Sequence, residues 1–218
     1  VPNARKMEEV TYDEMLEMAS LGAKVLHSRC VEIAKKYGVE LLVCSSLNRN
    51  SGTMVREKTK MEKMLISGVA ADKNVAKIRV AGLGNDPEST FRLLNLLDRN
   101  NLNIDVMIQS LGKDGTKSVS FTVAKPDMLR TIDVLNDNKD SLGIKKLDYD
   151  ETVAKISVIG AGVRSHSGVA AKMFGALANA GINTEMITTS EIRITALIDE
   201  AYADQAMRAI HETFLEHV

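Results

Sequence analysis

The chain contains two copies of one sequence pattern, and this internal repeat limits the folds that it can adopt. The segment Ala76–Gly82 recurs as Ala154–Gly160, an offset of 78 residues. Each copy continues with a glycine-rich turn and an amphipathic segment typical of a helix. The later matching segments are 102–105 with 182–185, and 119–123 with 194–198. The length differences between the copies fall in turns, as expected for two copies of one fold.

Within each copy the pattern predicts the order strand, helix, strand, strand, helix. Alternating apolar residues indicate half-buried strands at Ile78 and Val80 and again at Ile156 and Val158. The other expected elements are a hairpin at Asp114-Gly115, helices at about 127–138 and 202–216, and a strand at 143–149. This order predicts an α+β chain of two βαββαβ, ferredoxin-like repeats, each an antiparallel sheet with helices on one face.

The second copy ends on its helix and has no fourth strand after it. An unassigned strand-like segment, Met64–Ala70, precedes the first copy. We expect this segment to cross over and complete the second sheet, which would lock the repeats together. The alternative is a bare sheet edge or a shortened tail.

The first fifty residues follow a different pattern. Thr11 and the acidic residues after it predict the start of a helix, which Gly22 interrupts. A second helical stretch to about Tyr37 and a strand at 39–45 should follow. Residues 48–59 read as a linker or a hairpin. The methionines of this region are expected to pack in a core: Met7, Met15 and Met18.

Composition disfavours several classes of function. The 28 Lys and Arg residues balance 29 Asp and Glu residues, and aromatic residues make up only 4% of the chain. No basic field or aromatic platform therefore favours nucleic acid, including an RNA-binding reading of the sheets. No apolar run is long enough to span a membrane, so no membrane partner is expected. Cys30 and Cys44 show no metal-ligand spacing and fit reduced thiols in a cytoplasmic protein. The start at Val1, without a signal segment, suggests a fragment or a processed product.

Two glycine loops follow the first strand of each copy. Gly82-Leu83-Gly84 and Gly160-Ala161-Gly162 each precede a helix, but neither carries a third glycine, and a hairpin rather than a parallel crossover follows. A dinucleotide site is therefore disfavoured. The free N–H groups of the helix start could instead bind the carboxylate of a small zwitterion, with Asn or Asp side chains of the neighbouring strand holding its ammonium group. The alternative is that the glycines only turn a corner.

The histidines show neither a catalytic triad nor a metal pattern. His166, where a helix should begin, is expected to form a local hydrogen bond, and His211 and His217 are expected to be solvated. The cations Arg5, Lys6 and Lys24 could contact phosphates or could simply be solvated.

These segments together resemble the aspartokinase family over essentially the whole chain. Residues 1–19, Gly22–His27 and Val31–Tyr37 resemble the end of the catalytic domain of aspartokinases, and the repeats resemble their tandem ACT domains. The strongest matches are Val158–Gly162 through Ser165-His166, and Thr188–Ile194. The domains expected from the resemblance are an amino-acid-kinase remnant at 1–50, a linker at 51–63, a first ACT domain at 64–150 with its crossing strand near 64–72, and a second ACT domain at 151–218.

The resemblance implies an enzyme that transfers the γ-phosphoryl group of ATP, with Mg²⁺, to the β-carboxylate of aspartate, for lysine, threonine and methionine synthesis. It places part of the ATP site at Val1, Pro2, Asn3, Ala4, Arg5, Lys6 and Lys24. The family's N-terminal lysine segment and its aspartate-binding residues are absent from this sequence. The chain is therefore expected to hold no complete catalytic set, to require no cofactor of its own, and to be inactive alone.

The resemblance also implies that end-product amino acids, lysine or threonine, bind between paired ACT domains and inhibit the kinase. The residues expected to bind them are Asn85, Asp86, Thr90, Asn103, Ile104, Asp105 and Gln109 in the first repeat, and Val169, Ala170, Asn183, Thr184, Thr189 and Ser190 in the second. The loop Asn85–Glu88 departs from the family's usual Asp-Lys-Pro-Gly, which would weaken this site, shift it to Asp86 or favour a cationic effector. A homodimer through the ACT sheets is expected. A stand-alone amino-acid-binding ACT protein is the alternative.

Overall fold

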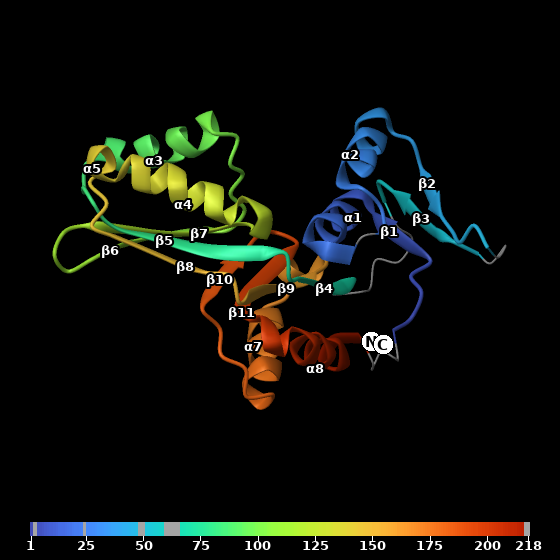
Figure 1. The fold of residues 1–218 in the computed structure, drawn as a ribbon. Helices are drawn as coiled ribbons and strands as arrows, with labels where there is room; N and C mark the ends of the chain where they lie inside the picture. Colours follow the sequence, from blue (N-terminus) through green and yellow to red (C-terminus); the bar gives the residue numbers. More distant parts are fainter. Residues whose placement is uncertain (2–3, 24, 48–50, 59–65, 216–218) are drawn as a thin grey trace. The chain divides into compact units, whose positions relative to one another are not determined.

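Residues 1, 4–23, 25–47, 51–58 and 66–215 are described in the structure, a computed structural model of the chain (Figure 1). The chain divides into two compact units. One unit is formed by Val1–Lys73 together with Lys155–Val218, and the other by Asn74–Ala154. The first unit therefore contains both ends of the chain, while the second is one continuous segment.

The continuous unit contains the first repeat. Its elements are β5 (Val75–Leu83), α3 (Pro87–Arg99), β6 (Met107–Leu111), β7 (Lys117–Ala124), α4 (Met128–Asp137), the short α5 (Lys139–Leu142) and β8 (Lys146–Asp150). The strands form an antiparallel sheet in the order β6-β7-β5-β8, and α3 and α4 lie on one face of it (Figure 1). Ile78, Val80, Leu93 and Phe121 are fully buried in the core between the two layers. The predicted βαββαβ arrangement is confirmed.

The hairpin between β6 and β7 turns at Asp114 and Gly115, as predicted from the sequence. Gly115 has a φ of 74°, a backbone conformation that glycine adopts without strain. The backbone N–H and the hydroxyl of Thr116 donate hydrogen bonds to the Asp114 carboxylate, and these bonds lower the pKa of Asp114 below its usual value. The charged form of Asp114 therefore stabilises the turn.

The second sheet receives one strand from outside its own repeat. Its elements are β4 (Gly68–Asp72), β9 (Val153–Ile159), the short α6 (Gly162–Ser165), α7 (Val169–Asn179), β10 (Met186–Thr189), β11 (Arg193–Asp199) and α8 (Ala203–Leu215). The strand order is β10-β11-β9-β4, and Gly68 to Asp72 pair antiparallel with Ile159 to Lys155. The crossing expected from the sequence is thus observed in β4, and residues 64–65 lie outside the described part of the chain.

Strand β9 is buried on both faces, so the prediction of a half-buried strand at Ile156 and Val158 was wrong. One face carries Ile156 and Val158, which belong to the apolar interior. On the other face, Ile159 packs in a core with residues of the N-terminal segment, including Val10 and Met18. The polar residues of that face are buried as well, because each has a polar partner: Lys155 forms a 3.1 Å ion pair with Asp72, and Ser157 lies 2.7 Å from the hydroxyl of Thr195. Alternation in the sequence therefore did not mean exposure.

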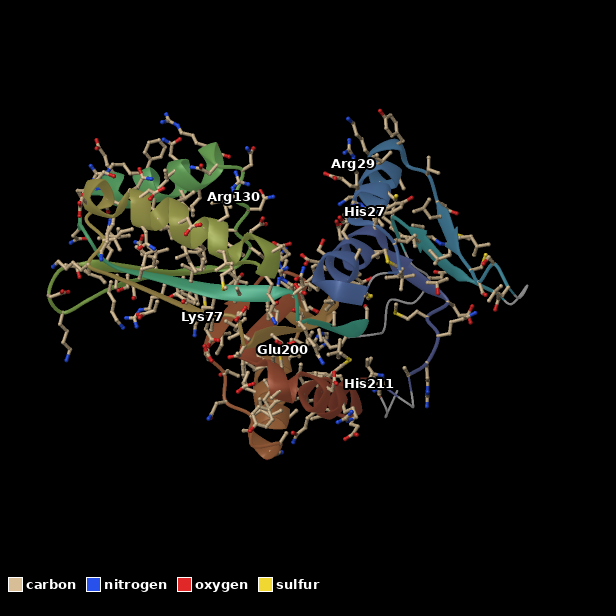
Figure 2. All side chains as sticks on the ribbon, viewed as in Figure 1. His27, Arg29, Lys77, Arg130, Glu200 and His211 are labelled. Atoms are coloured by element: carbon tan, nitrogen blue, oxygen red, sulfur yellow. The ribbon has the colours of Figure 1, made fainter. Side chains whose placement is uncertain are left out.

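The N-terminal segment forms a small layer of its own. It comprises β1 (Glu9–Thr11), α1 (Tyr12–Met18) with an irregular turn at Ala19–Ala23, α2 (Ser28–Tyr37), β2 (Leu41–Val43) and β3 (Thr53–Arg56). Strand β3 pairs parallel with β1 and antiparallel with β2. As predicted, Thr11 caps α1, and its hydroxyl and the Glu14 carboxylate form a reciprocal capping box. His27 caps α2 by accepting a hydrogen bond from the N–H of Arg29 (both labelled in Figure 2).

Two predictions, for residues 53–56 and for His211, need correction. Of the linker or hairpin expected at 48–59, the hairpin alternative is observed: β3 pairs antiparallel with β2, and the fully buried Val55 anchors it in the core, so residues 53–56 are not a linker. His211, labelled on α8 in Figure 2, is not solvated but 7% exposed. It lies on the same helix face as Ile210 and Ala206, the face that α8 turns to the core. His217 lies outside the described residues.

The methionine prediction is confirmed, since Met15 and Met18 are buried and Met7 packs against the same core. In the part of the chain that the structure describes, no helix is both long and apolar enough to cross a membrane.

Candidate functional site

The start of α3 in the first repeat forms a polar junction. Asp86 precedes the helix, and its carbonyl oxygen accepts hydrogen bonds from Lys117 Nζ, at 2.7 Å, and from Ser89 Oγ, at 3.1 Å. One turn into the helix, Thr90 Oγ1 donates to Oε1 of Gln109 on β6, at 2.6 Å. The junction therefore combines free N–H groups of a helix start with an ammonium group, a set suited to a carboxylate.

Lys117 is a member of this junction that sequence reasoning missed. It is the first residue of β7, and the strand register sets it opposite both Leu83 of β5 and Leu111 of β6. Its position at the junction depends on the pairing register of the β6–β7 hairpin, and no local sequence motif indicates that register. At the corresponding place the second repeat has Ile192, so the cation is particular to the first repeat.

The register also separates the expected residues of the first repeat into two groups. Asn85, Asp86 and Thr90 lie at the end of the sheet where β5 finishes, and Gln109 joins them through its hydrogen bond to Thr90. Residues 103–105 lie at the other end, where the N–H of Asp105 donates to the carbonyl of Thr122, the partner of Lys77.

The distance between these groups exceeds the size of an amino acid. The strand from Lys77 to Leu83 advances about 3.3 Å per residue, or roughly 20 Å in total. Helix α3, which joins the two ends, has 13 residues and a similar length of about 20 Å. One bound amino acid cannot contact Asn85 and Asn103 of the same repeat, so a ligand that contacts residues of both groups would need a second repeat to supply one of them.

The second repeat shows the same separation. Ala170 is exposed at the start of α7, while Val169 beside it is buried and can offer only its backbone. Thr189 and Ser190 are exposed at the same end of the sheet, since the N–H of Gly160 donates to the carbonyl of Ile192. Asn183 and Thr184 follow the far end of α7, next to the hydrogen bond from the N–H of Glu185 to Leu197.

The loop before α7 is held by local side-chain contacts. Ser165 Oγ lies 2.8 Å from His166 Nδ1, which confirms the local hydrogen bond predicted for His166. Arg164 reaches Glu191 of the β10–β11 turn with a 2.9 Å ion pair between exposed side chains. These contacts connect the glycine loop to the turn that carries Ser190.

A third candidate region is a pocket of about 400 Å³ in the N-terminal segment. Its lining residues are Lys6, Val25, Val43, Cys44, Ser45, Ser51, Gly52 and Thr53. Lys6 Nζ donates to both the carbonyl and the hydroxyl of Ser51 and forms a 3.0 Å ion pair with Glu8. The pocket thus offers an ammonium group beside apolar side chains and hydroxyls, a combination that suits a phosphate-bearing ligand with an apolar part.

Of the described residues expected to bind ATP, only Lys6 lines this pocket. Val1, Ala4 and Arg5 are exposed outside it, while Pro2, Asn3 and Lys24 lie outside the described residues. The described residues hold no group of three or more His, Cys, Asp and Glu side chains placed to bind a metal ion.

Comparison with protein families finds two matches. Residues 1–45 match the amino acid kinase family, and residues 156–214 match an ACT domain family. These are the segments that carry the Lys6 pocket and the second repeat.

Comparison with individual proteins extends the similarity over the whole chain. The aspartokinase of Pseudomonas aeruginosa is 40% identical over 217 residues, which are 98% of this chain and 53% of that protein. The chain therefore spans about half the length of the curated relatives that it matches.

Solved structures show the same similarity. A structure of aspartokinase alpha and beta subunits is 43% identical, with a TM-score of 0.64, over 68% of this chain and 98% of that chain. The structure of E. coli aspartokinase III in complex with lysine and aspartate, called the T-state, is 25% identical, with a TM-score of 0.79, over 99% of this chain and 48% of that chain.

Proposed function

Because this chain belongs to the aspartokinase family, we propose that it is the regulatory region of a feedback-inhibited aspartokinase. The parent enzyme would transfer the γ-phosphoryl group of ATP to the β-carboxylate of aspartate. Its end products, lysine or threonine, would bind to the repeats described here. The observation that carries this proposal is the polar junction at the start of α3, together with the exposed Ala170, Thr189 and Ser190 at the corresponding place in the second repeat.

The chemistry of the first junction suits an α-amino acid. The ammonium group of Lys117 and the N–H groups at the start of α3 favour a carboxylate. Glu88 in the first turn of α3 adds a carboxylate, and so does Asp86, which lies 3.5 Å from Arg92; these carboxylates favour a ligand that also carries positive charge. The α-ammonium group meets this need in either amino acid, and the side chain of lysine adds a second cation.

The 20 Å separation within a repeat supports a dimer. A second copy of the chain, paired through the first sheet, would supply Asn103 and Asp105 to the junction of its partner. An effector bound between two copies then favours one arrangement of the pair by its differential affinity, and this is the physical basis of feedback inhibition.

For the N-terminal segment we propose a part in the ATP site of the parent enzyme. Lys6 would contact the phosphates, and the apolar wall of Val25 and Val43 would contact the base. Mg²⁺ bound with ATP would neutralise charge that develops on the phosphates during transfer. The chain alone is expected to show no transfer to aspartate, because it has no complete catalytic set.

Replacing Lys117 by Met tests the first junction. Met keeps the apolar stem and removes the ammonium group, so we expect lysine or threonine to bind about tenfold more weakly, a loss of about 1.4 kcal/mol. Calorimetric titration measures the change. Lys113→Met, in the neighbouring turn, is the matched control and should bind as the wild type does. Equal affinities for Lys117→Met and the wild type would remove Lys117 from the site.

Mixing two variants tests whether the site lies between copies. Lys117→Met and Asn103→Ala would each weaken every site in its own homodimer, but a mixed dimer keeps one site of wild-type affinity. If subunits exchange at random, half of the dimers are mixed, and about a quarter of all sites should recover. Titration of the equal mixture with the tighter-binding amino acid measures this fraction. No recovery, with subunit exchange shown by mass spectrometry, would contradict a site between copies.

A further inference from the structure

An ion pair connects the second repeat to the N-terminal segment. Arg193, the first residue of β11, reaches Glu17 in the last turn of α1, with 2.9 Å between Nη1 and Oε2. Both side chains are largely buried, at 19% and 25% exposed. Water screens a largely buried charge pair only weakly. Removing either partner would leave the other charge buried without compensation, which destabilises the fold.

The Arg193 end of the pair belongs to the turn that carries the candidate effector residues. The N–H of Ser190 donates to the carbonyl of Arg193, at 2.7 Å, and closes the turn between β10 and β11. The Nε atom of Arg193 is buried and has no hydrogen-bond partner among the described residues. The backbone of Arg193 is thus hydrogen-bonded to Ser190, while its guanidinium group is held by Glu17 through Nη1.

The Glu17 end belongs to a helix that lines a cavity next to the candidate nucleotide pocket. Met15 and Met18 of α1 line a small apolar cavity of about 130 Å³. Val25, Val43 and Thr53 line that cavity and also the larger pocket that contains Lys6. A shift of α1 therefore changes the common wall of the two cavities.

A second polar contact ties α1 to the second sheet. The hydroxyl of Ser67, just before β4, donates to the Glu14 carboxylate, and the carbonyl of Ile159 accepts from the N–H of Ser67. This contact holds the first turn of α1 to the β4–β9 edge. The Arg193 pair holds the last turn to β11, so the two contacts together fix the direction of the helix.

We propose that Arg193 is a positioning residue that couples the effector turn of the second repeat to helix α1, and through α1 to the Lys6 pocket. The claim that an effector acts through Arg193 rests on the proposed function. The claim that Arg193 positions α1 rests only on the contacts above. A ligand that moves Ser190 moves the anchor of Arg193, and the buried pair transmits this change to Glu17.

Hydrogen exchange of the whole chain tests the mechanical part without any ligand. In Arg193→Met, amides of residues 12–18 should exchange at least about tenfold faster than in the wild type, with little change in α8. Arg193→Lys should restore most of the protection, and so should the charge exchange Glu17→Arg with Arg193→Glu. Arg164→Met, which breaks the exposed pair with Glu191, is the matched control and should leave α1 unchanged.

Two results would overturn the coupling. One is exchange in α1 that stays within about twofold of the wild type in Arg193→Met and in Glu17→Gln. The other is an equal acceleration in α1 and α8, which would mean general destabilisation. If a variant folds poorly by circular dichroism, the charge-exchanged pair decides, because recovery of α1 protection requires a direct interaction.

A second arm tests the regulatory part with lysine and with threonine. The bound amino acid should change exchange in α1 of the wild type, while Arg193→Met should bind it with no change in α1. Unchanged α1 exchange in a wild-type chain saturated with either amino acid overturns the regulatory part. If the wild type binds neither, the proposed function fails, and the ligand-free arm alone decides the mechanical link.

Discussion

Gly22→Ala is expected to destabilise the unit that contains both chain ends by about 3 kcal/mol or more. Gly22 has a φ of 100°, where a residue with a side chain is strained by roughly 1–3 kcal/mol. A Cβ atom at this position would also meet the carbonyl oxygen of Ala71 on β4 far inside van der Waals contact. Because the obstacle is backbone, β4 and the α1 turn must separate before the new atom fits.

Gly38→Ala is the matched control for this prediction. Gly38 also has a positive φ, 65°, but a Cβ atom there would meet nothing within 4 Å. We expect a cost of about 1 kcal/mol from the backbone alone. Urea unfolding followed by circular dichroism measures both variants. Equal losses of unfolding free energy in the two variants would show that the clash between the added Cβ atom and the carbonyl of Ala71 contributes nothing.

Ile159→Ala is expected to cost about 2–5 kcal/mol and to loosen a helix that lies far from it in the sequence. Ile159 is fully buried at the end of β9, in the core that it shares with Val10, Met18 and Ala70. Removing the side chain leaves a cavity, and the surrounding residues lose both burial and contacts. Since the cavity opens toward the N-terminal segment, exchange of the α1 amides should accelerate as well.

Ile187→Ala provides the control on the same sheet. Ile187 lies on β10 and is 45% exposed, so the same substitution should cost less than about 1 kcal/mol. Denaturant unfolding gives the stability change, and hydrogen exchange reports on α1. If Ile159→Ala left α1 protected, the core shared by the second repeat and the N-terminal segment would not stabilise that helix.

The sequence predicted the parts of the fold that depend on repetition and local signals. The repeat offset, the Asp114-Gly115 turn and the Thr11 cap each report on neighbours in the chain, and each is observed. The crossing of β4 also followed from the sequence, because the second repeat lacked a strand and an unassigned one was available.

The remaining features depend on what packs against a residue from a distance. Residues 48–59 were compatible with a linker or with a hairpin, because Gly52 and the charges near it are typical of a turn. The hairpin is observed, but β3 becomes a central strand only because β1 supplies a parallel neighbour on its other side. His211 was predicted to be solvated because histidine side chains often lie on the surface. In the structure, β4 and α7 pack against the face of α8 that carries His211. Local composition does not report either contact.

The candidate sites divide in the same way. The glycine loops indicated helix starts, and α3 begins at Pro87, while in the second repeat the short α6 comes before α7, which begins at Val169. Lys117 and Arg193 could not be found, because one depends on hairpin register and the other on the contact of two segments 176 residues apart. Both positions become visible only when the sheets are assembled.

Titration of this chain with lysine and with threonine, separately and together, tests the central claim most directly. Calorimetry would measure binding, and light scattering would follow the mass of the protein in the same samples. The regulatory proposal predicts saturable binding of at least one of the two amino acids by a stable dimer. A monomer at micromolar concentration that binds neither, even after Asn85→Asp returns the family's carboxylate to the first junction, would contradict it.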